Sequence, residues 1–366
     1  MFQKHPTQLT CTMRILLLLP LFGALCQALP QFNSSGVNQE RFYTNPILDH
    51  IAPDPNILKY NGFYYMVYTL QDRIEILKSP ILSNFRNAER KEVFHVYNGR
   101  NCACWAPELH NIRGELFIYF TMDDCVADAN HRMYVIKADS NDPMGIWSSP
   151  VRLPFCPAQF KNLLYRLLPE ENIYAIDGTV LQYDNQLYFI WTGFPEPPGS
   201  MNLYIARMEN PMRVLPPRIL LRTPTMDWEM HGYPVNEGPF IVQNAGRTFL
   251  IFSASSTFTP DYCLGMMGID DMRDPLIQSN WWNDLNFCLF QRNDAENVFG
   301  TGHASFVRSP DDSELWMVYH AVDDVNDLGI NRRARIQKMD WNADNSPKFP
   351  AAIGINKPLP APSGEQ

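Results

Sequence analysis

The sequence predicts an all-β protein folded as a five-bladed β-propeller, because two strand patterns alternate five times along the chain. In the first pattern, a polar turn leads into a strand rich in aromatic residues, at 62–68, 114–120, 186–191, 246–252 and 314–319. In the second, a strand-like stretch that opens at polar residues precedes each of these segments, at 54–58, 105–109, 176–181, 236–242 and 302–307. An all-β unit that recurs at steps of roughly 50 to 70 residues is typical of small sheets arranged radially around an axis.

Each repeat also contains the outer strands that a propeller blade requires. A third, alternating strand follows the aromatic one, at 73–77, 132–136, 202–206, 262–267 and 333–337. Edge-like segments such as 91–95 and 218–221 supply a fourth strand, and four strands make one blade. Large residues of the aromatic strands are expected to pack between blades, among them Tyr65, Phe117, Phe189 and Trp316.

The five repeats define one closed domain over residues 42–341, because no Pro/Ser-rich linker interrupts them. We expect residues 29–41 to form an N-terminal extension. The tail at 342–366 carries five prolines, which predict an irregular and partly disordered segment.

Residues 1–28 have the features of a secretory signal peptide. An apolar run at 15–25 follows the basic residues Lys4 and Arg14 and ends near Ala28, a small residue that suits cleavage. The run is shorter than the roughly 20 residues that span a bilayer. We therefore predict a secreted, extracellular protein, with a signal anchor or a buried N-terminal segment as the alternatives.

The charge balance narrows the class of partner. The chain has 30 basic and 39 acidic residues, a net charge of −9, and loss of the signal peptide would remove two basic residues and no acidic one. Nucleic acid and anionic membranes repel a chain this acidic, so neither is expected as a partner. No protein partner is inferred, and a neutral polysaccharide is a suitable substrate.

Cysteine usage agrees with secretion. Six cysteines follow the signal peptide: Cys102, Cys104, Cys125, Cys156, Cys263 and Cys288. An even number in a secreted chain predicts up to three disulfides, and the last two cysteines lie in consecutive strand-like segments of one repeat, where they can bridge locally. A zinc site at Cys102 and Cys104 is not favoured, because no second cysteine pair has the spacing that zinc requires.

The inner strand of each blade runs beside the propeller axis, so polar residues at its start converge on one small volume. At these positions stand Asp54, Glu108, Asp177, Glu237 and His303. Charged side chains beside strand cores are costly to bury without a partner or a task. Any one acid could be a turn or capping residue. Together they suit glycoside hydrolysis, which needs a carboxylate to activate water and a protonated acid to release the leaving oxygen.

Short motifs in every repeat, in order, resemble the landmarks of glycoside hydrolase family 43 over residues 42–341. They are Asn45-Pro-Ile-Leu48 with Ala52-Pro-Asp-Pro55, Trp105-Ala-Pro-Glu108, Ile176-Asp-Gly-Thr179, Asn236-Glu-Gly-Pro239 and Gly302-His-Ala-Ser-Phe306. The resemblance implies a five-bladed propeller that acts on arabinans or xylans, and it is strongest to the exo-acting α-L-arabinofuranosidase branch. One departure is Pro53, an additional proline that restricts the backbone beside Asp54.

The same resemblance implies the catalytic roles. Asp54 would be the general base, Glu237 the general acid, and Asp177 the residue that orients the acid and raises its pKa. The physical chemistry agrees, since a like charge nearby keeps a carboxylic acid protonated near neutral pH. Glu108 is implied to be structural or peripheral.

Four residues are expected to contact the substrate: Trp105, His231, His303 and Arg333. Trp105 has an apolar face that can stack on a sugar ring, or it packs between blades. His231 precedes Glu237 closely and would line the pocket. Arg333 is one of three arginines that open the third strand of the last repeat, and it either reaches a sugar hydroxyl or forms an edge salt bridge.

His303 has two interpretations under the resemblance. It lies at the propeller axis beside the sugar, or it is a ligand of a hydrated calcium ion there. Calcium prefers oxygen ligands, so the metal interpretation is the weaker one. No cofactor is expected to be required, and a structural calcium ion at the axis is the one ion that the resemblance allows.

The sequence therefore predicts a secreted, inverting glycoside hydrolase that releases α-L-arabinofuranosyl units from arabinan or related plant cell-wall polysaccharides. A β-xylosidase or an endo-arabinanase on the same scaffold is the nearest alternative. A non-catalytic, glycan-binding propeller is the alternative from another class, and the retention of three mutually repelling acids speaks against it.

Overall fold

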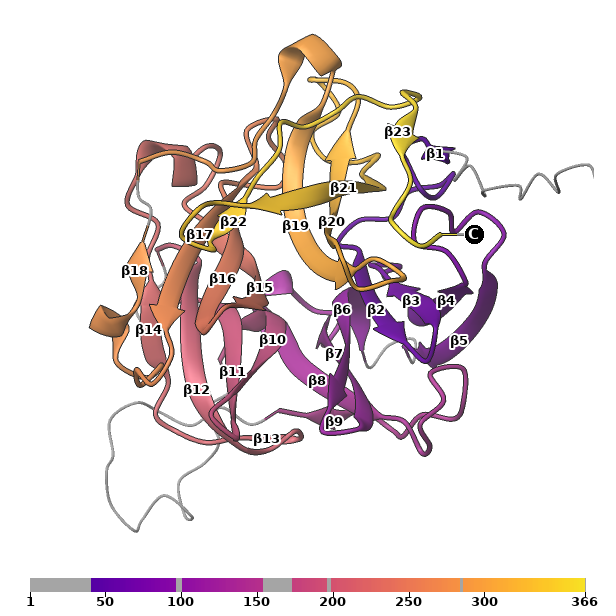
Figure 1. Cartoon of the computed structure of the whole chain (residues 1–366). Coiled ribbons are helices and arrows are strands. Elements are labelled where there is room, and N and C mark those ends of the chain that lie inside the picture. The colour runs from indigo at the N-terminus through magenta and orange to yellow at the C-terminus, as the bar shows by residue number, and fades with distance from the viewer. Residues whose placement is uncertain (1–40, 97–100, 154–172, 196–198, 284–285, 366) are drawn as a thin grey trace, which may run out of the picture. The chain divides into compact units, whose positions relative to one another are not determined.

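The computed structural model describes residues 41–96, 101–153, 173–195, 199–283 and 286–365. Within these residues five antiparallel sheets follow one another in chain order around a central region, which confirms the predicted five-bladed propeller (Figure 1). The described helical segments are short 3₁₀ turns, and no described helix is long and apolar enough to cross a membrane. The predicted signal peptide lies outside the described residues, as does nearly all of the predicted extension.

Each blade is a meander whose inner strand begins at one end of the domain. The inner strands are β2 (Asn56–Tyr60), β6 (Cys102–Ile112), β10 (Ala175–Tyr183), β15 (Asn236–Asn244) and β19 (Phe299–Arg308). The second strands are β3 (Phe63–Val67), β7 (Glu115–Asp123), β11 (Gln186–Gly193), β16 (Arg247–Ala254) and β20 (Leu315–Val322). The third strands are β4 (Arg73–Ser79), β8 (Arg132–Lys137), β12 (Asn202–Asn210), β17 (Cys263–Asp270) and β21 (Arg333–Trp341).

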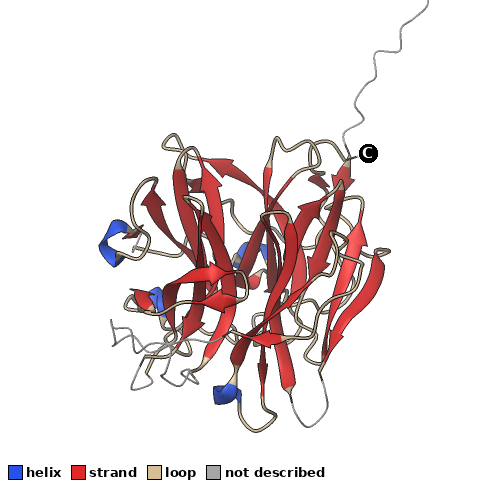
Figure 2. Ribbon diagram, turned by 90° about the horizontal axis from the view of Figure 1, so that it is seen from below, coloured by secondary structure: helices blue, strands red, loops and turns tan. Residues whose placement is uncertain are grey.

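Outer strands complete the five blades. They are β5 (Glu89–His95), β9 (Val151–Arg152), β13 (Arg213–Val214) with β14 (Ile219–Arg222), β18 (Trp282–Asn283) and β22 (Pro347–Lys348). Because neighbouring strands are antiparallel, the loops between second and third strands lie at the end where the inner strands begin. Seen from the side, the strands run between two sets of loops (Figure 2). Residues far apart in sequence therefore meet at one end of the axis.

The aromatic strands fill the spaces between blades, as predicted. Tyr65, Phe117, Phe189 and Trp316 are all buried. Phe117 of β7 and Phe189 of β11 share one apolar cluster, while Trp316 of β20 packs in a cluster with residues of β3. Each cluster joins two neighbouring blades, so burial of apolar area holds the ring of sheets together.

Contacts between the chain's two ends close the ring. β1 (Phe42–Tyr43) pairs with β23 (Leu359–Pro360), and the Asn45 side chain exchanges two hydrogen bonds of 2.9 Å with the main chain of Ile336. The segment after Trp341, which we expected to be an irregular tail, supplies β22 and β23 instead. Pairing with β22 satisfies the outer edge of β21, so the expected boundary at residue 341 falls inside the fifth blade.

Two disulfides occur among the described cysteines. Cys263 pairs with Cys288, as predicted, and Cys102 pairs with Cys125. Cys104 is a buried free thiol whose pKa is raised by burial. Cys104 packs in the apolar core between the first two blades, so it takes part in no disulfide, and Cys156 lies outside the described residues.

Candidate active site

A repeated backbone feature marks the start of every inner strand. Each blade has a residue with a positive φ at an equivalent position there: Asp54 (56°), Ala106 (43°), Asp177 (53°), Gly238 (54°) and His303 (47°). In β6 and β19 a second residue with a positive φ lies three positions earlier, at Ala103 (50°) and Gly300 (57°). In the last four blades the residue at the equivalent position lies within a register shift between the first and second strands. Such a bulge re-aims a side chain, and left-handed backbone costs a residue with a Cβ about 1–2 kcal/mol. Positions of this kind cluster at functional sites.

This feature shows which sequence candidates are equivalent. Asp54, Asp177 and His303 occupy the same position in their blades. In the fourth blade the position is Gly238, where a Cβ would lie 3.2 Å from the His303 ring, and Glu237 is the residue directly before it. Glu108 lies two residues after Ala106, the equivalent position of the second blade. Its Oε2 lies 2.7 Å from His110 Nε2, in agreement with a structural role.

Asp54 is buried and surrounded by donors. Its Oδ2 accepts a hydrogen bond of 2.7 Å from the Thr69 hydroxyl, and its Oδ1 accepts one of 3.0 Å from Arg332 Nη1. His303 Nδ1 lies 3.4 Å from the same Oδ1. The main-chain N–H of Asp54 donates to His320 Nδ1 at 3.0 Å, so this nitrogen carries no proton.

These neighbours fix the charge of Asp54. Burial by itself raises the pKa of Asp54, but the charges of Arg332 and His303 outweigh burial and hold the pKa well below its usual range. Burial lowers the pKa of His320 to about 4, which agrees with its role as an acceptor. Asp54 is therefore an ionised carboxylate at neutral pH.

Asp177 and Glu237 form the second pair of the site. The Gly238 N–H donates to Asp177 Oδ2 at 3.1 Å, and the Tyr262 hydroxyl donates to Glu237 Oε1 at 2.8 Å. Burial, followed by the charge of Asp177, raises the pKa of Glu237 to about 7. Burial also raises the pKa of Asp177 to about 6, against the opposing charge of His303. The pair therefore retains a proton near neutral pH.

We call Asp54, Asp177, Glu237 and His303 the axial cluster. A nitrogen of His303 and one carboxyl oxygen from each of Asp177 and Glu237 lie within 4.8 Å of one another. Burial lowers the pKa of His303, but the three carboxyl groups of the axial cluster outweigh burial and raise it. Calcium takes about six to eight oxygen ligands, so three groups that include a nitrogen fit it poorly. Calcium at the axis stays a prediction, and no chemical step below depends on it.

Trp105 lies on β6 directly before Ala106, whose N–H donates at 2.7 Å to the Thr69 hydroxyl that also contacts Asp54. Its ring stacks on His131 with the centroids 3.7 Å apart, and its Nε1–H donates to Gln71 Oε1 at 2.8 Å. Trp105 stays partly exposed, whereas the tryptophans that pack between blades, such as Trp191, are buried. Stacking of Trp105 on a sugar stays a prediction.

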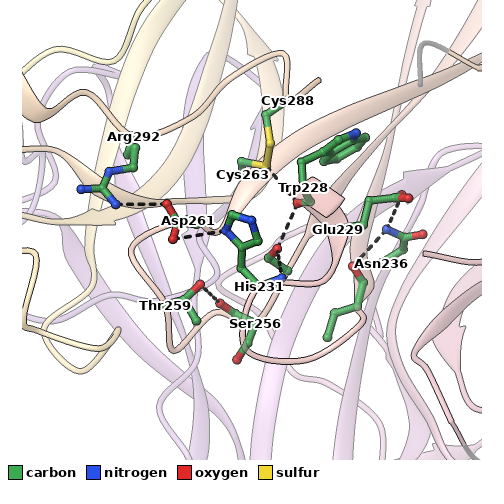
Figure 3. The surroundings of a disulfide bond; sticks show 12 residues. Trp228, Glu229, His231, Asn236, Ser256, Thr259, Asp261, Cys263, Cys288 and Arg292 are labelled. Carbon is green, nitrogen blue, oxygen red and sulfur yellow. Dashed lines mark hydrogen bonds and ion pairs between the residues drawn. A yellow bond between two sulfur atoms is a disulfide. The ribbon is translucent and has the colours of Figure 1, made fainter. Parts of the chain in front are cut away.

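The contacts of His231 lie on the rim, away from the axial cluster. His231 is exposed, and its Nδ1 lies 3.2 Å from Asp261 Oδ2. Asp261 also pairs with Arg292 at 3.0 Å, beside the Cys263–Cys288 disulfide (Figure 3). His231 thus joins two loops of the fourth blade, since the Ser256 N–H donates to its carbonyl at 2.9 Å.

The structure brings Arg332, rather than Arg333, to the axial cluster. Arg333 pairs with Asp323, which also pairs with the fully buried Arg335. Together with Asn331 and other residues, Arg333 lines a separate cavity of about 650 Å³. Arg332 lies directly before β21 and contacts Asp54, whereas Arg333, the first residue of β21, contacts Asp323.

Sequence reasoning missed several residues that contact the axial cluster, among them Thr69, Ser253, Tyr262, His320 and the glycine at 238. Thr69 and Tyr262 lie in loops, Ser253 and His320 lie on second strands, and none of these four carries a motif of its own. Only the recurring positive φ, which becomes visible when the blades are compared in three dimensions, relates Gly238 to Asp54.

The axial cluster combines an ionised carboxylate with a carboxyl group that stays protonated. Pairs of titratable groups whose surroundings push their pKa values apart are the arrangement for general base and general acid chemistry. Asp54 has the low pKa and Glu237 the raised one.

Comparison with known proteins agrees with this chemistry. The family described as "Glycosyl hydrolases family 43" matches residues 43–347. An extracellular exo-α-(1→5)-L-arabinofuranosidase from Streptomyces avermitilis is 31% identical over 329 residues, which cover 86% of this chain and 64% of that protein. A protein of the same name from Streptomyces chartreusis is 30% identical over 288 residues, covering 76% of this chain and 82% of that protein.

The fold is also similar to solved structures. The crystal structure of an α-L-arabinofuranosidase from Lactobacillus brevis superposes with a TM-score of 0.77 at 30% identity, covering 86% of this chain and 98% of that one. The chain spans about two thirds or less of the length of several curated relatives, including 64% of the Streptomyces avermitilis protein and 63% of α-L-arabinofuranosidase B from Pyricularia oryzae.

Proposed function

The chain belongs to family 43 of the glycosyl hydrolases, and we propose that it removes α-L-arabinofuranosyl units from arabinan or related plant cell-wall polysaccharides. The observation that carries the proposal is the separation of the Asp54 and Glu237 pKa values within one buried cluster. The names of the relatives from Streptomyces and Lactobacillus support arabinofuranose as the sugar released.

We assign the three carboxyl groups to an inverting displacement. Asp54 removes a proton from a water molecule, whose oxygen attacks the anomeric carbon as the bond to the leaving oxygen breaks. Glu237 gives its proton to that leaving oxygen, so the products are a free sugar and the shortened chain. Asp177 keeps Glu237 protonated until then, because a second negative charge beside it is unfavourable.

Substrate contacts complete the proposal. His303, a member of the axial cluster, and Trp105, on the inner strand β6, are assigned to the sugar that is released. His231 and Arg333 lie further out and are assigned to the rest of the substrate. Arabinan and its oligosaccharides are neutral, which suits a chain with a net charge of −9.

We also propose that the protein is secreted. The two Streptomyces relatives are named extracellular, and the two disulfides suit an oxidising compartment.

One set of assays tests the activity. The protein is incubated with linear arabinan, branched arabinan, arabinoxylan and xylobiose, and the released sugars are identified. Free arabinose as the sole early product supports the proposal. Release of xylose from xylobiose would favour a β-xylosidase, longer arabino-oligosaccharides would favour an endo-arabinanase, and glycan binding without any product would favour a lectin-like role.

Stereochemistry tests the mechanism separately. Proton NMR of the first product, before mutarotation, is expected to show the anomeric configuration opposite to that of the substrate. Retention would mean that one carboxylate forms a covalent intermediate and that the assignment of Asp54 as a base is wrong.

A further inference from the structure

His131 occupies a junction between the second and third blades. It follows the 3₁₀ turn η1 (Asp128–Asn130) and has no exposed surface. Its carbonyl accepts a hydrogen bond of 3.2 Å from the N–H of Ala175, the first residue of β10 and two residues before Asp177. Its ring lies 3.7 Å from that of Trp105. His131 therefore contacts both Trp105 and β10, the strand that carries Asp177.

Both nitrogens of the His131 ring face main-chain carbonyl oxygens. Nδ1 lies 2.8 Å from the oxygen of Asp128, and Nε2 lies 3.0 Å from the oxygen of Ala103. A carbonyl oxygen only accepts hydrogen bonds, and a neutral imidazole has only one N–H. Two such contacts are satisfied together only when the ring carries a proton on each nitrogen.

Acidic groups surround this ring. One carboxyl oxygen of Asp123, one of Asp128 and a ring nitrogen of His131 lie within 4.8 Å of one another. A buried cation needs hydrogen-bond acceptors and opposite charge nearby. Here two carbonyl oxygens face the two ring nitrogens, and the carboxyl groups of Asp123 and Asp128 lie within 4.8 Å. The guanidinium of Arg132 contacts the main chain of His131, where its Nη1 donates to the carbonyl oxygen of His131 at 2.8 Å. Tyr174 presents its ring at 6.4 Å, edge to face.

We propose that His131 is a positioning residue, an imidazolium that holds the Trp105 indole in place for the sugar. A cation over an indole face is attracted by the negative face of the ring. The stack fixes one face of Trp105, and the bond to Gln71 fixes its edge. The side-chain conformation of Trp105 is thus fixed before the sugar binds. Binding then costs no side-chain conformational entropy at this residue. The effect of His131 on substrate binding rests on the proposed function. The charge of its ring does not.

The charge of the ring is tested without any substrate. Nitrogen-15 NMR of the full chain at neutral pH is expected to show both His131 ring nitrogens protonated, with the signals assigned by their loss in His131→Gln. His320 is the internal control, because its Nδ1 accepts from Asp54 and must have the shift of an unprotonated nitrogen. An unprotonated nitrogen in His131 would overturn the proposal, whether or not the protein hydrolyses arabinan.

The effect on substrate is tested by kinetics. His131→Gln removes the charge and one donor, so KM for arabinotriose should rise about tenfold, while kcat should stay within about twofold because the axial cluster is untouched. His95→Gln, on the exposed outer strand β5, is the matched control and should change neither value. A fall of kcat by about tenfold with an unchanged KM would contradict a positioning role.

A double-mutant cycle shows whether His131 acts through Trp105. Adding His131→Gln to Trp105→Ala should cause little further loss, since the partner of the imidazolium is already absent. Additive losses would mean that His131 acts by another route, and the proposal would fail. If His131→Gln does not fold, the ring signals of His131 are assigned in the unaltered chain by their nuclear Overhauser contacts to Trp105, and the nitrogen-15 experiment still decides the charge of the ring.

Discussion

The carboxylate of Asp177 accepts a 3.1 Å hydrogen bond from the main chain of Gly238, the residue directly after Glu237. This bond joins the inner strands of two neighbouring blades and keeps two carboxyl groups close enough to repel each other. The charge of Asp177 raises the pKa of Glu237, after burial itself. The position of an acid on one blade therefore depends on the backbone of the next.

Varying the leaving group should separate the roles of Glu237 and Asp54. Glu237→Gln removes the proton donor, so hydrolysis of arabino-oligosaccharides should fall roughly 100 to 10,000-fold, while an aryl arabinofuranoside, which leaves as a stable phenolate, should lose far less. Asp54→Asn should reduce both substrates alike, because water must be activated in either case. Rates for both substrates decide this, and equal losses in the two variants would refute the assignment of acid and base.

Removing the charge of Asp177 should move the pH profile. With Asp177→Asn, the pKa of Glu237 should fall from about 7 toward the ordinary value for a glutamate, since one of its causes is lost. Glu237 would then lose its proton at lower pH, so the alkaline limb of the kcat profile should shift toward acid. An alkaline limb that stays in place would show that Asp177 does not control the acid.

Arg332 should control the acidic limb. Its charge lowers the pKa of Asp54, so Arg332→Met should raise that pKa and shift the acidic limb of kcat/KM to higher pH. Arg333→Met is the matched control, because Arg333 pairs with Asp323 instead. The same shift in both variants would mean that the cause is a general change in charge.

Gly238→Ala should test the crowded contact between the fourth and fifth blades. Alanine at a φ of 54° costs about 1–2 kcal/mol, and its Cβ would lie 3.2 Å from the His303 ring. Gly62→Ala is the control, because Gly62 has a φ of 79° but no neighbour within 4 Å of the added Cβ. Both variants should be destabilised in a denaturant titration, and only Gly238→Ala should lose activity. Full activity of Gly238→Ala would mean that the displaced His303 has no role.

The Cys263–Cys288 disulfide should stabilise the fourth blade. It joins residues 25 apart, and a closed loop of that length stabilises the folded state by about 3–4 kcal/mol in the chain-entropy model. The double variant Cys263→Ser/Cys288→Ser should lose stability of that order in guanidinium titrations. Mass spectrometry after thiol blocking should find Cys104 blocked only once the protein is unfolded, and labelling of Cys263 without reduction would contradict the pairing.

The sequence by itself determined the blades and three of the acids in the axial cluster. Alternation of polar and apolar residues has a period of two in any strand, so the strands could be located without the fold. The five-fold recurrence then placed Asp54, Asp177 and Glu237 at the inner ends of their strands. Cys263 and Cys288 could be paired because they lie in neighbouring segments of one repeat.

The tertiary structure alone decided which partners those acids have. Arg332 and Arg333 are adjacent arginines in the sequence, and only the folded structure shows that the first contacts Asp54 and the second contacts Asp323. His131 lies between the 3₁₀ turn η1 and β8, whereas Trp105 lies on β6, and only the folded blade brings their rings together. The place of Glu237, one residue before the equivalent position, becomes visible only when the backbones of the blades are compared. Such contacts join residues distant in the chain, and no local pattern encodes them, because their energies depend on the packing of neighbouring blades.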